Sequence, residues 1–202
     1  MKITPIEEGN YYHIYNRGNN GINLFYEKEN YLHFLRLYEK YIDPVTETIA
    51  WVLLKNHFHL LVYIKFQTEI DANLLSYSTV EKPKEINVSK QFSNLFNAYT
   101  QSMNKRYKRT GSLFEKPFRR KLISNDKYFQ NMIYYIHNNP VKHGFVDDMI
   151  DYPWSSYASV LSTGKTRLHR KKVLDIFTNA ANFVNYHSSI QNMDNIDDLI
   201  MD

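Results

Sequence analysis

The stretch TIAWVLLKNHFHLLVYI, residues 48–64, decides the fold. It contains two runs of mostly apolar residues, 48–54 and 57–64, each of strand length and rich in residue types that favour strands. Only the polar pair Lys55-Asn56 separates the runs, so they are predicted to form the two antiparallel strands of a hairpin. The expected framework is therefore an antiparallel sheet that includes this hairpin.

The segments on either side of the hairpin predict the remaining elements. Further strands are predicted at 11–17, before the turn Gly18-Asn19-Asn20-Gly21, and at 119–123. Helices are predicted at 27–41, at 89–107, from the caps Ser124 or Asn125 to Pro140, and at 165–187, from apolar residues three and four apart. The polar residues 65–90 are predicted to form a long mobile loop. This order predicts an α+β fold, with an antiparallel sheet and helices packed on one face.

The composition excludes several classes of site. The chain has no cysteine, which excludes disulfides, thiolate metal sites and a cysteine nucleophile. No secretory leader is visible at the N-terminus, and no segment approaches the roughly 20 apolar residues that span a bilayer. We therefore expect a soluble, cytoplasmic protein, and its net charge of +4 is compatible with association with the nucleoid.

A dense basic segment lies at 105–121. It holds Lys105, Arg106, Lys108, Arg109, Lys116, Arg119, Arg120 and Lys121, with Glu115 as its single acid. Tyr107, Phe114 and Phe118 are interleaved with these bases. Cationic groups mixed with rings are typical of a groove that binds nucleic acid by charge and by base stacking. The alternative is a solvated loop with surface lysines.

Two histidines form the sharpest chemical feature. Residues two apart on a strand point to the same side, so His57 and His59 present two imidazoles together, while Phe58 faces the opposite side. Two such imidazoles can bind one metal ion. Most pairs with this spacing are polar residues on the surface of a sheet, and that alternative stays open.

The predicted helix before Pro140 carries a tyrosine on its polar face. Tyr135 and Asn139 are one helical turn apart, on the face opposite the apolar stripe of that helix. A phenol and an amide oxygen can therefore reach the same place. The alternative is that this tyrosine only anchors the helix to the sheet.

Six motifs resemble, in the same order, those of the REP-associated tyrosine transposases, a branch of the single-tyrosine HUH transposases related to the smallest bacterial insertion elements. The motifs are HIYNRG at 13–18, LKNHFHLL at 54–61, residues 99–104, RTGSLF at 109–114, YIHNNPV at 135–141 and WSSY at 154–157. Together they cover roughly residues 11–160. Each motif alone is modest, but six in register are specific.

The resemblance implies a ferredoxin-like fold, with the two histidines on a central strand and the tyrosine on a nearby helix. It implies that His57 and His59 bind the metal and that Asn139 is the third ligand. Tyr135 is the implied nucleophile and Tyr134 its rival. The metal is expected to be Mg²⁺ or Mn²⁺, with phosphate and water oxygens completing its shell. The implied substrate is single-stranded or hairpin DNA, cleaved to a 5′-phosphotyrosyl link and a free 3′-OH.

DNA contacts are expected from the basic segment and from the turn after the first strand. The expected set is Arg17, Lys105, Arg106, Lys108, Arg109, Arg119, Arg120 and Lys121. We expect a catalytic domain at 1–160 and a partly helical extension with an acidic tail at 161–202, in a monomer or homodimer. The chain departs from the family pattern at Lys55, where proline is frequent, at His143, where a small residue is usual, and in the length of the 65–90 loop.

Two other functions remain open. One is a nucleic-acid-binding module of the same fold that has lost catalysis, and the other is a phosphodiesterase in which water attacks and Tyr135 only packs. The covalent hypothesis requires that the sheet bring both imidazoles close to the Tyr135 phenol, with that ring outside the interior of the protein.

Overall fold

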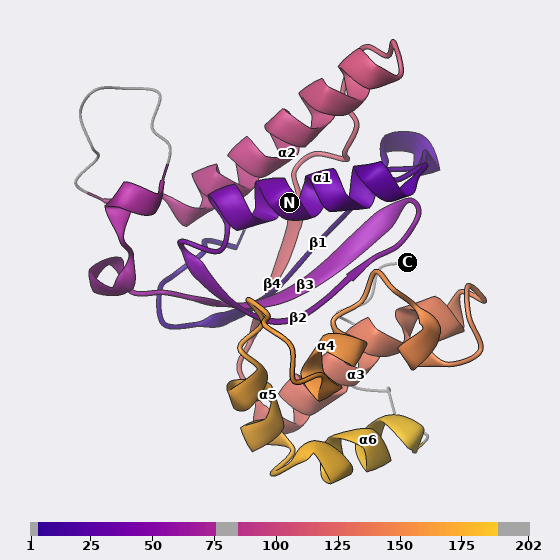
Figure 1. Ribbon diagram of the computed structural model, residues 1–202. Coiled ribbons are helices and arrows are strands. Elements are labelled where there is room, and N and C mark those ends of the chain that lie inside the picture. The colour runs from indigo at the N-terminus through magenta and orange to yellow at the C-terminus, as the bar shows by residue number, and fades with distance from the viewer. Residues whose placement is uncertain (1–3, 76–84, 190–202) are drawn as a thin grey trace.

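The computed structural model describes residues 4–75 and 85–189, which form a four-stranded sheet between two layers of helices (Figure 1). The strands are β1 (Tyr11–Arg17), β2 (Thr46–Leu53), β3 (His57–Ile64) and β4 (Arg119–Ile123). The helices are α1 (Lys28–Tyr41), α2 (Val88–Arg106), α3 (Asp126–Lys142), α4 (Tyr157–Leu161), α5 (Arg170–Ile176) and α6 (Ala180–Ser188). Short 3₁₀ turns lie at Asn19–Gly21, Gln67–Glu69, Ala72–Leu74 and Met149–Asp151.

The sheet has the order β2-β3-β1-β4, and every neighbouring pair of strands is antiparallel. With the chain order β1, α1, β2, β3, α2, β4, this is the ferredoxin-like arrangement. The predicted α+β class and the predicted hairpin are therefore confirmed. β1, β3 and β4 have the predicted bounds, whereas β2 begins two residues earlier than the predicted strand at 48–54.

Two hydrophobic cores lie on opposite faces of the sheet. Phe58, Leu60 and Val62 of β3 belong to the core under α1 and α2, and Leu61 belongs to the core under α3. The prediction that helices pack on one face holds for α1 and α2 but is wrong for α3 and the helices after it, which cover the second face (Figure 1). The reason is that the second face also carries apolar residues, which must be covered.

The sequence predicts that α3 ends at Pro140, but the helix continues to Lys142. Proline has no backbone N–H, so one hydrogen bond of the helix is missing, and this loss is tolerated close to the end of the helix. The end is closed by Gly144, whose φ of +67° is easily adopted only by glycine. Its N–H donates to Val141 O at 2.9 Å, and the N–H of Phe145 donates to Pro140 O at 2.8 Å.

The single helix predicted at 165–187 is two helices, α5 and α6. The chain turns at Thr178, whose φ is +72°, and Asn179 then caps α6 by accepting a hydrogen bond from the Asn182 N–H at 2.8 Å. Val173 of α5 and Phe183 of α6 are both fully buried in the core under α3. The predicted acidic tail, residues 194–202, lies outside the described residues.

A buried chain of hydrogen bonds ties α6 to α3 and to the sheet. The His187 Nδ1–H donates to Phe183 O at 2.8 Å, so its Nε2 accepts from the His137 Nδ1–H at 3.0 Å. His137 Nε2 then accepts from the Ser156 hydroxyl at 2.8 Å, and Ser156 Oγ accepts from the Trp51 N–H at 2.9 Å. Both imidazoles are neutral in this arrangement, and all four of their nitrogens are hydrogen bonded.

The predicted loop at 65–90 falls partly on residues 76–84, which lie outside the described residues. Before that gap the chain forms two 3₁₀ turns, and after it Asn87 caps α2 by accepting a hydrogen bond from the Lys90 N–H at 2.9 Å. In the described parts of the chain, no helix is both long enough and apolar enough to cross a bilayer.

Candidate active site

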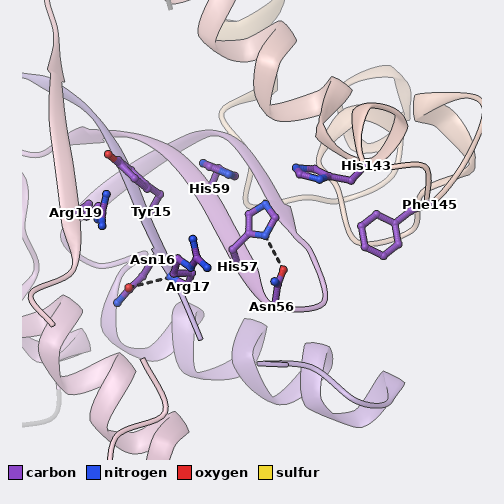
Figure 2. Close-up of a pocket in the computed structure, with 9 residues that line it drawn as sticks. All are labelled: Tyr15, Asn16, Arg17, Asn56, His57, His59, Arg119, His143 and Phe145. Carbon is purple, nitrogen blue, oxygen red and sulfur yellow. Dashed lines mark hydrogen bonds between the residues drawn. The ribbon is translucent and has the colours of Figure 1, made fainter. Parts of the chain in front are cut away.

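A cavity of about 380 Å³ opens where β1 ends and β3 begins, next to the C-terminal end of α3. Its volume falls within the range of small-ligand sites. It is lined by Tyr15, Asn16, Arg17, Asn56, His57, His59, Arg119, His143 and Phe145 (Figure 2). Imidazoles and guanidinium groups around one cavity favour an anionic ligand, such as a phosphodiester, with or without a metal ion.

His57 and His59 lie on the same side of β3, as predicted, with ring centroids 5.2 Å apart and ring planes at 85°. The His57 Nδ1–H donates to Asn56 Oδ1 at 2.8 Å, so the neutral form of this ring would have its lone pair on Nε2. His59 Nδ1 is 2.9 Å from His13 Nε2 on β1. His59 Nε2 is buried, and within the described residues no group forms a hydrogen bond with it.

Burial keeps the inner histidines neutral. Burial lowers the pKa of His13 to about 3, with a smaller contribution from the charge of Lys121. Burial also holds the pKa of His59 well below its usual value, and the neighbouring rings of His13, His57 and His143 add to the effect. A neutral imidazole is the form that binds a metal ion, so this environment suits a ligand better than a cation.

α3 turns its two adjacent tyrosines in different directions. The Tyr135 ring meets His59 edge-on at 5.2 Å and His13 at 6.3 Å. The Tyr134 ring instead lies 6.4 Å from Tyr186 and 5.7 Å from His187, both on α6. The structure thus brings Tyr135, and not Tyr134, to the histidine pair.

Tyr135 is close to the imidazoles but is not open to solvent. Its exposed fraction is 2%, and it is not among the residues that line the cavity. The proximity expected from the sequence is therefore present, whereas the expected position outside the interior is not. A phosphate can reach this phenol only after a movement that uncovers it.

Asn139 follows Tyr135 by one turn of α3 and is fully buried. Its Nδ2–H donates to the Tyr135 carbonyl at 3.0 Å, and its Oδ1 is buried with no hydrogen-bond partner in the described part of the chain. Within residues 4–75 and 85–189, no group of three His, Asp or Glu side chains is placed to hold a metal ion. By chemical type, two imidazoles and an amide oxygen suit a divalent ion whose other ligands are phosphate and water oxygens.

Three of the five cavity-lining side chains that were not predicted carry rings. The His143 ring lies 5.1 Å from that of His57, and the Tyr15 ring stacks beside His59 at 5.8 Å. Phe145 lies at the outer rim of the cavity, beyond His143 (Figure 2). The sequence carried signals for two of them, because Tyr15 is two residues after His13 on a strand and His143 is one helical turn after Asn139.

Two of the predicted DNA-binding arginines line the cavity and share one acid. Arg17 Nε lies 3.2 Å from Glu115 Oε1, and Arg119 Nη2 lies 3.6 Å from Glu115 Oε2. Lys121 is on the same side of β4 as Arg119, and its register partner on β1 is His13. Arg120 points to the other face of the sheet, where its Nη1–H donates to the Ser89 hydroxyl at 2.9 Å.

The rest of the basic segment lies elsewhere. Arg106, at the end of α2, pairs with Glu27 at 2.7 Å, near the start of α1. Lys105 and Lys108 are exposed in the same region, and Arg109 donates to Asn104 Oδ1 at 3.1 Å. The bases at 105–121 therefore do not form one groove, because the chain folds back between α2 and β4 (Figure 1).

The rings interleaved with these bases are not arranged for stacking on nucleic acid. Phe114 and Phe118 are buried in the core under α2, and the Tyr107 hydroxyl donates to Glu27 at 2.5 Å. For Phe114 and Phe118 the expectation of exposed rings is wrong, because the hydrophobic gain of burying them in the core outweighs a position on the surface, whereas Tyr107 is half-buried.

Comparisons with known proteins place this geometry in context. No protein-family model matches the chain. Over 115 residues it is 32% identical to a curated protein of Haemophilus influenzae that is named a REP-associated tyrosine transposase. The match covers 55% of this chain and 58% of the relative, so the chain spans little more than half of that protein.

Among solved structures, the chain is similar to a REP-associated tyrosine transposase bound to a REP hairpin. The TM-score is 0.56 and the sequence identity 20%, with 81% of this chain and 86% of the other covered. At this identity the similarity concerns the fold alone. A bacterial tRNA(His) guanylyltransferase-like protein in complex with GTP is more distant, with 10% identity and a TM-score of 0.42 over 71% of this chain and 67% of that chain.

The sequence relative and the structural neighbour carry the same family name, which is also the family that the six motifs indicate. The resemblance is therefore confirmed: this chain is related to the REP-associated tyrosine transposases and has their fold.

Proposed function

We propose that this protein is a transposase-like enzyme that binds hairpin DNA, cleaves a single strand in a metal-dependent reaction and transfers the strand through a covalent 5′-phosphotyrosine. The observation that carries the proposal is the contact between the Tyr135 and His59 rings at 5.2 Å, beside a cavity that Arg17 and Arg119 also line. The relatives support the DNA substrate, because the solved neighbour is bound to a REP hairpin.

In the proposed reaction, a movement first uncovers the buried ring of Tyr135, which then supplies the nucleophile. Its phenol oxygen forms a bond to phosphorus and gives up its proton, while the bond from phosphorus to the 3′ oxygen breaks. The 3′ oxygen takes up a proton and leaves as a 3′-OH. A second 3′-OH can later reverse the exchange and join two strands, because the phosphotyrosine keeps the bond energy. The proposed reaction therefore needs no ATP, and the protein needs no glycine-rich loop to bind a nucleotide.

The other site residues would bind and orient the phosphate. His57, His59 and Asn139 are the groups that would hold Mg²⁺ or Mn²⁺, which polarises the phosphate when it is bound. Arg17 and Arg119 would pair with phosphate oxygens on either side of the scissile bond. Since these contacts are electrostatic, DNA affinity should fall steeply with salt.

The test is the formation of a covalent adduct. The protein is incubated with Mn²⁺ and end-labelled single strands that carry a hairpin, and the products are separated under denaturing conditions. The parent and Tyr134→Phe, a matched change on the next residue of α3, should form a protein–DNA adduct, whereas Tyr135→Phe should form none. Tyr15→Phe is included because Tyr15 also lines the cavity. If Tyr135→Phe forms as much adduct as the parent, the nucleophile is wrongly assigned.

The burial of Tyr135 favours a second candidate, a protein that binds hairpin DNA without a covalent step. That protein would bind with the same salt dependence and would cleave nothing with any divalent ion. Cleavage without an adduct, retained in Tyr135→Phe, would instead point to attack by water.

A further inference from the structure

We propose that His13 is a positioning residue that holds the His59 ring so that His59 Nε2 presents its lone pair to a divalent metal ion. The inference rests on one element of the proposed function, namely that the histidine pair binds a metal. It adds to the site a residue on β1 that touches neither the metal nor the DNA.

The register of the sheet places His13 beside His59. Tyr15 is the register partner of His59, and His13 lies two residues earlier on β1, on the same side of the sheet. His13 is therefore a diagonal neighbour of His59, within reach of a long side chain. The two rings are nearly parallel, at 20°, with centroids 5.1 Å apart, and His13 Nε2 is 2.9 Å from His59 Nδ1.

The direction of this hydrogen bond decides what His59 can do. A neutral imidazole has one donor and one acceptor nitrogen. If the His59 Nδ1–H donates to His13, the lone pair of His59 is on Nε2 and can bind a metal. If His13 donates instead, His59 carries a proton on Nε2 and cannot bind. A metal ion at His59 Nε2 selects the first arrangement, in which His13 is the acceptor.

His57 has the same arrangement, built from a different residue. Its Nδ1–H donates to the amide oxygen of Asn56, which fixes the lone pair on Nε2. Both histidines of the pair therefore use Nδ1 for a neighbour within the protein and keep Nε2 as the coordinating atom. Metal-binding histidines are commonly oriented by such a hydrogen bond on the second nitrogen.

The surroundings of His13 point to this contact as its purpose. The residue is fully buried, stacked on Tyr15 at 4.6 Å, and its Nδ1 has no hydrogen-bond partner among the described residues. A buried imidazole with one unsatisfied nitrogen is costly for a residue that only packs, because an apolar side chain would fill the same space without that penalty. The contact with His59 is the interaction that accounts for it.

The test measures metal binding by the full chain in the absence of DNA. Mn²⁺ alone is titrated, and unbound Mn²⁺ is followed by its electron paramagnetic resonance signal. His13→Leu removes the acceptor, whereas His13→Gln keeps an oxygen near the position of Nε2. His33→Leu is the matched control, since His33 on α1 also makes one side-chain hydrogen bond, to Ser102 Oγ at 2.9 Å, far from the pair.

We expect His13→Leu to weaken Mn²⁺ binding about 10- to 100-fold, as loss of an orienting partner does elsewhere. His13→Gln should restore most of the affinity, and His33→Leu should leave it unchanged. Thermal unfolding of each variant shows whether it is folded. Equal affinity of the parent and His13→Leu would overturn the inference, and so would a loss in His13→Gln as large as in His13→Leu.

A second measurement needs no variant. Nitrogen-15 NMR of the parent loaded with Zn²⁺, a diamagnetic probe, should show His59 protonated on Nδ1, with His13 Nε2 as the acceptor. Protonation of His59 on Nε2, or a parent that binds neither ion, would overturn the inference. A parent that binds Mn²⁺ in a His13-dependent manner but forms no DNA adduct would contradict only the proposed function.

Discussion

The buried link between α6 and α3 predicts a specific loss of stability in acid. Burial of the ring in the core lowers the pKa of His187 to about 4, from 6.5 in the unfolded chain, and this effect outweighs the hydrogen bond to the Phe183 carbonyl oxygen, which acts to raise the pKa. The folded state therefore binds this proton less readily than the unfolded state. Its contribution to stability is fully present above pH 6.5 and is lost as the pH falls toward 4.

The size of the effect follows from these two pKa values. One pKa unit corresponds to about 1.4 kcal/mol, so the full contribution of His187 is about 3 kcal/mol. Between pH 7 and pH 5 the linkage relation gives a loss of about 2 kcal/mol from this residue. His13, His59 and His137 are also buried with lowered pKa values and add to the total slope in the parent.

A single substitution isolates the share of His187. His187→Leu leaves the His137 Nδ1–H without its acceptor, so the variant should be less stable at pH 7 by about 1–3 kcal/mol. Its further loss between pH 7 and pH 5 should nevertheless be about 2 kcal/mol smaller than that of the parent, because leucine cannot be protonated in the unfolded chain.

The assay is urea unfolding at the two pH values, followed by circular dichroism and fitted for the free energy of unfolding. Tyr186→Phe is the control, because Tyr186 is next to His187 on α6 and its hydroxyl donates to Asn131 on α3. The substitution removes this hydrogen bond between the two helices without removing a group that titrates between pH 5 and pH 7. Tyr186→Phe should lose as much stability as the parent between these pH values. If His187→Leu also loses as much as the parent, His187 is not held neutral by the fold and the reasoning fails.

Two further predictions concern the turn after β1 and the acid that pairs with the two arginines of the cavity. A Cβ at Gly18 would lie 1.9 Å from the Ile22 carbonyl oxygen. Gly18→Ala should therefore lower the free energy of unfolding by at least about 2 kcal/mol, measured by urea unfolding. An unchanged urea midpoint would contradict this. Glu115→Gln removes the carboxylate that Arg17 and Arg119 share, so hairpin DNA should bind more tightly and with a salt slope steeper by about 1, measured by fluorescence anisotropy. Weaker binding would mean that Glu115 holds the arginines in place rather than competing with phosphate.

The strands could be predicted well because their signals are local. The run at 57–64 alternates two polar imidazoles with buried apolar residues, and β3 has the predicted bounds. Pro140 predicts a helix end because proline breaks helices, but Gly144, four residues later, determines where α3 closes. The break at Thr178 depends on a left-handed backbone conformation that a β-branched residue rarely adopts, and helical spacing alone cannot show it.

The site was predicted in part for the same reason. The spacing of His57 and His59 and the helical phase of Tyr135 are properties of single elements, and the structure brings these three rings together. His13 was seen only as a member of a motif, since its contact with His59 depends on the register between β1 and β3. The burial of Tyr135 depends on how α3 packs on the sheet, which the sequence of one helix does not specify.

The alternation along β3 has a consequence for how this protein can change. Phe58 and Leu60 pack in the hydrophobic core on one face of the sheet. His57 and His59, which alternate with them along β3, point to the opposite face and belong to the candidate site. Adjacent codons are thus subject to unrelated demands, one for a hydrophobic interior and one for coordination chemistry. An insertion of one residue in this strand would exchange the two sets of side chains, so this part of the gene can vary by substitution but not by a change in length.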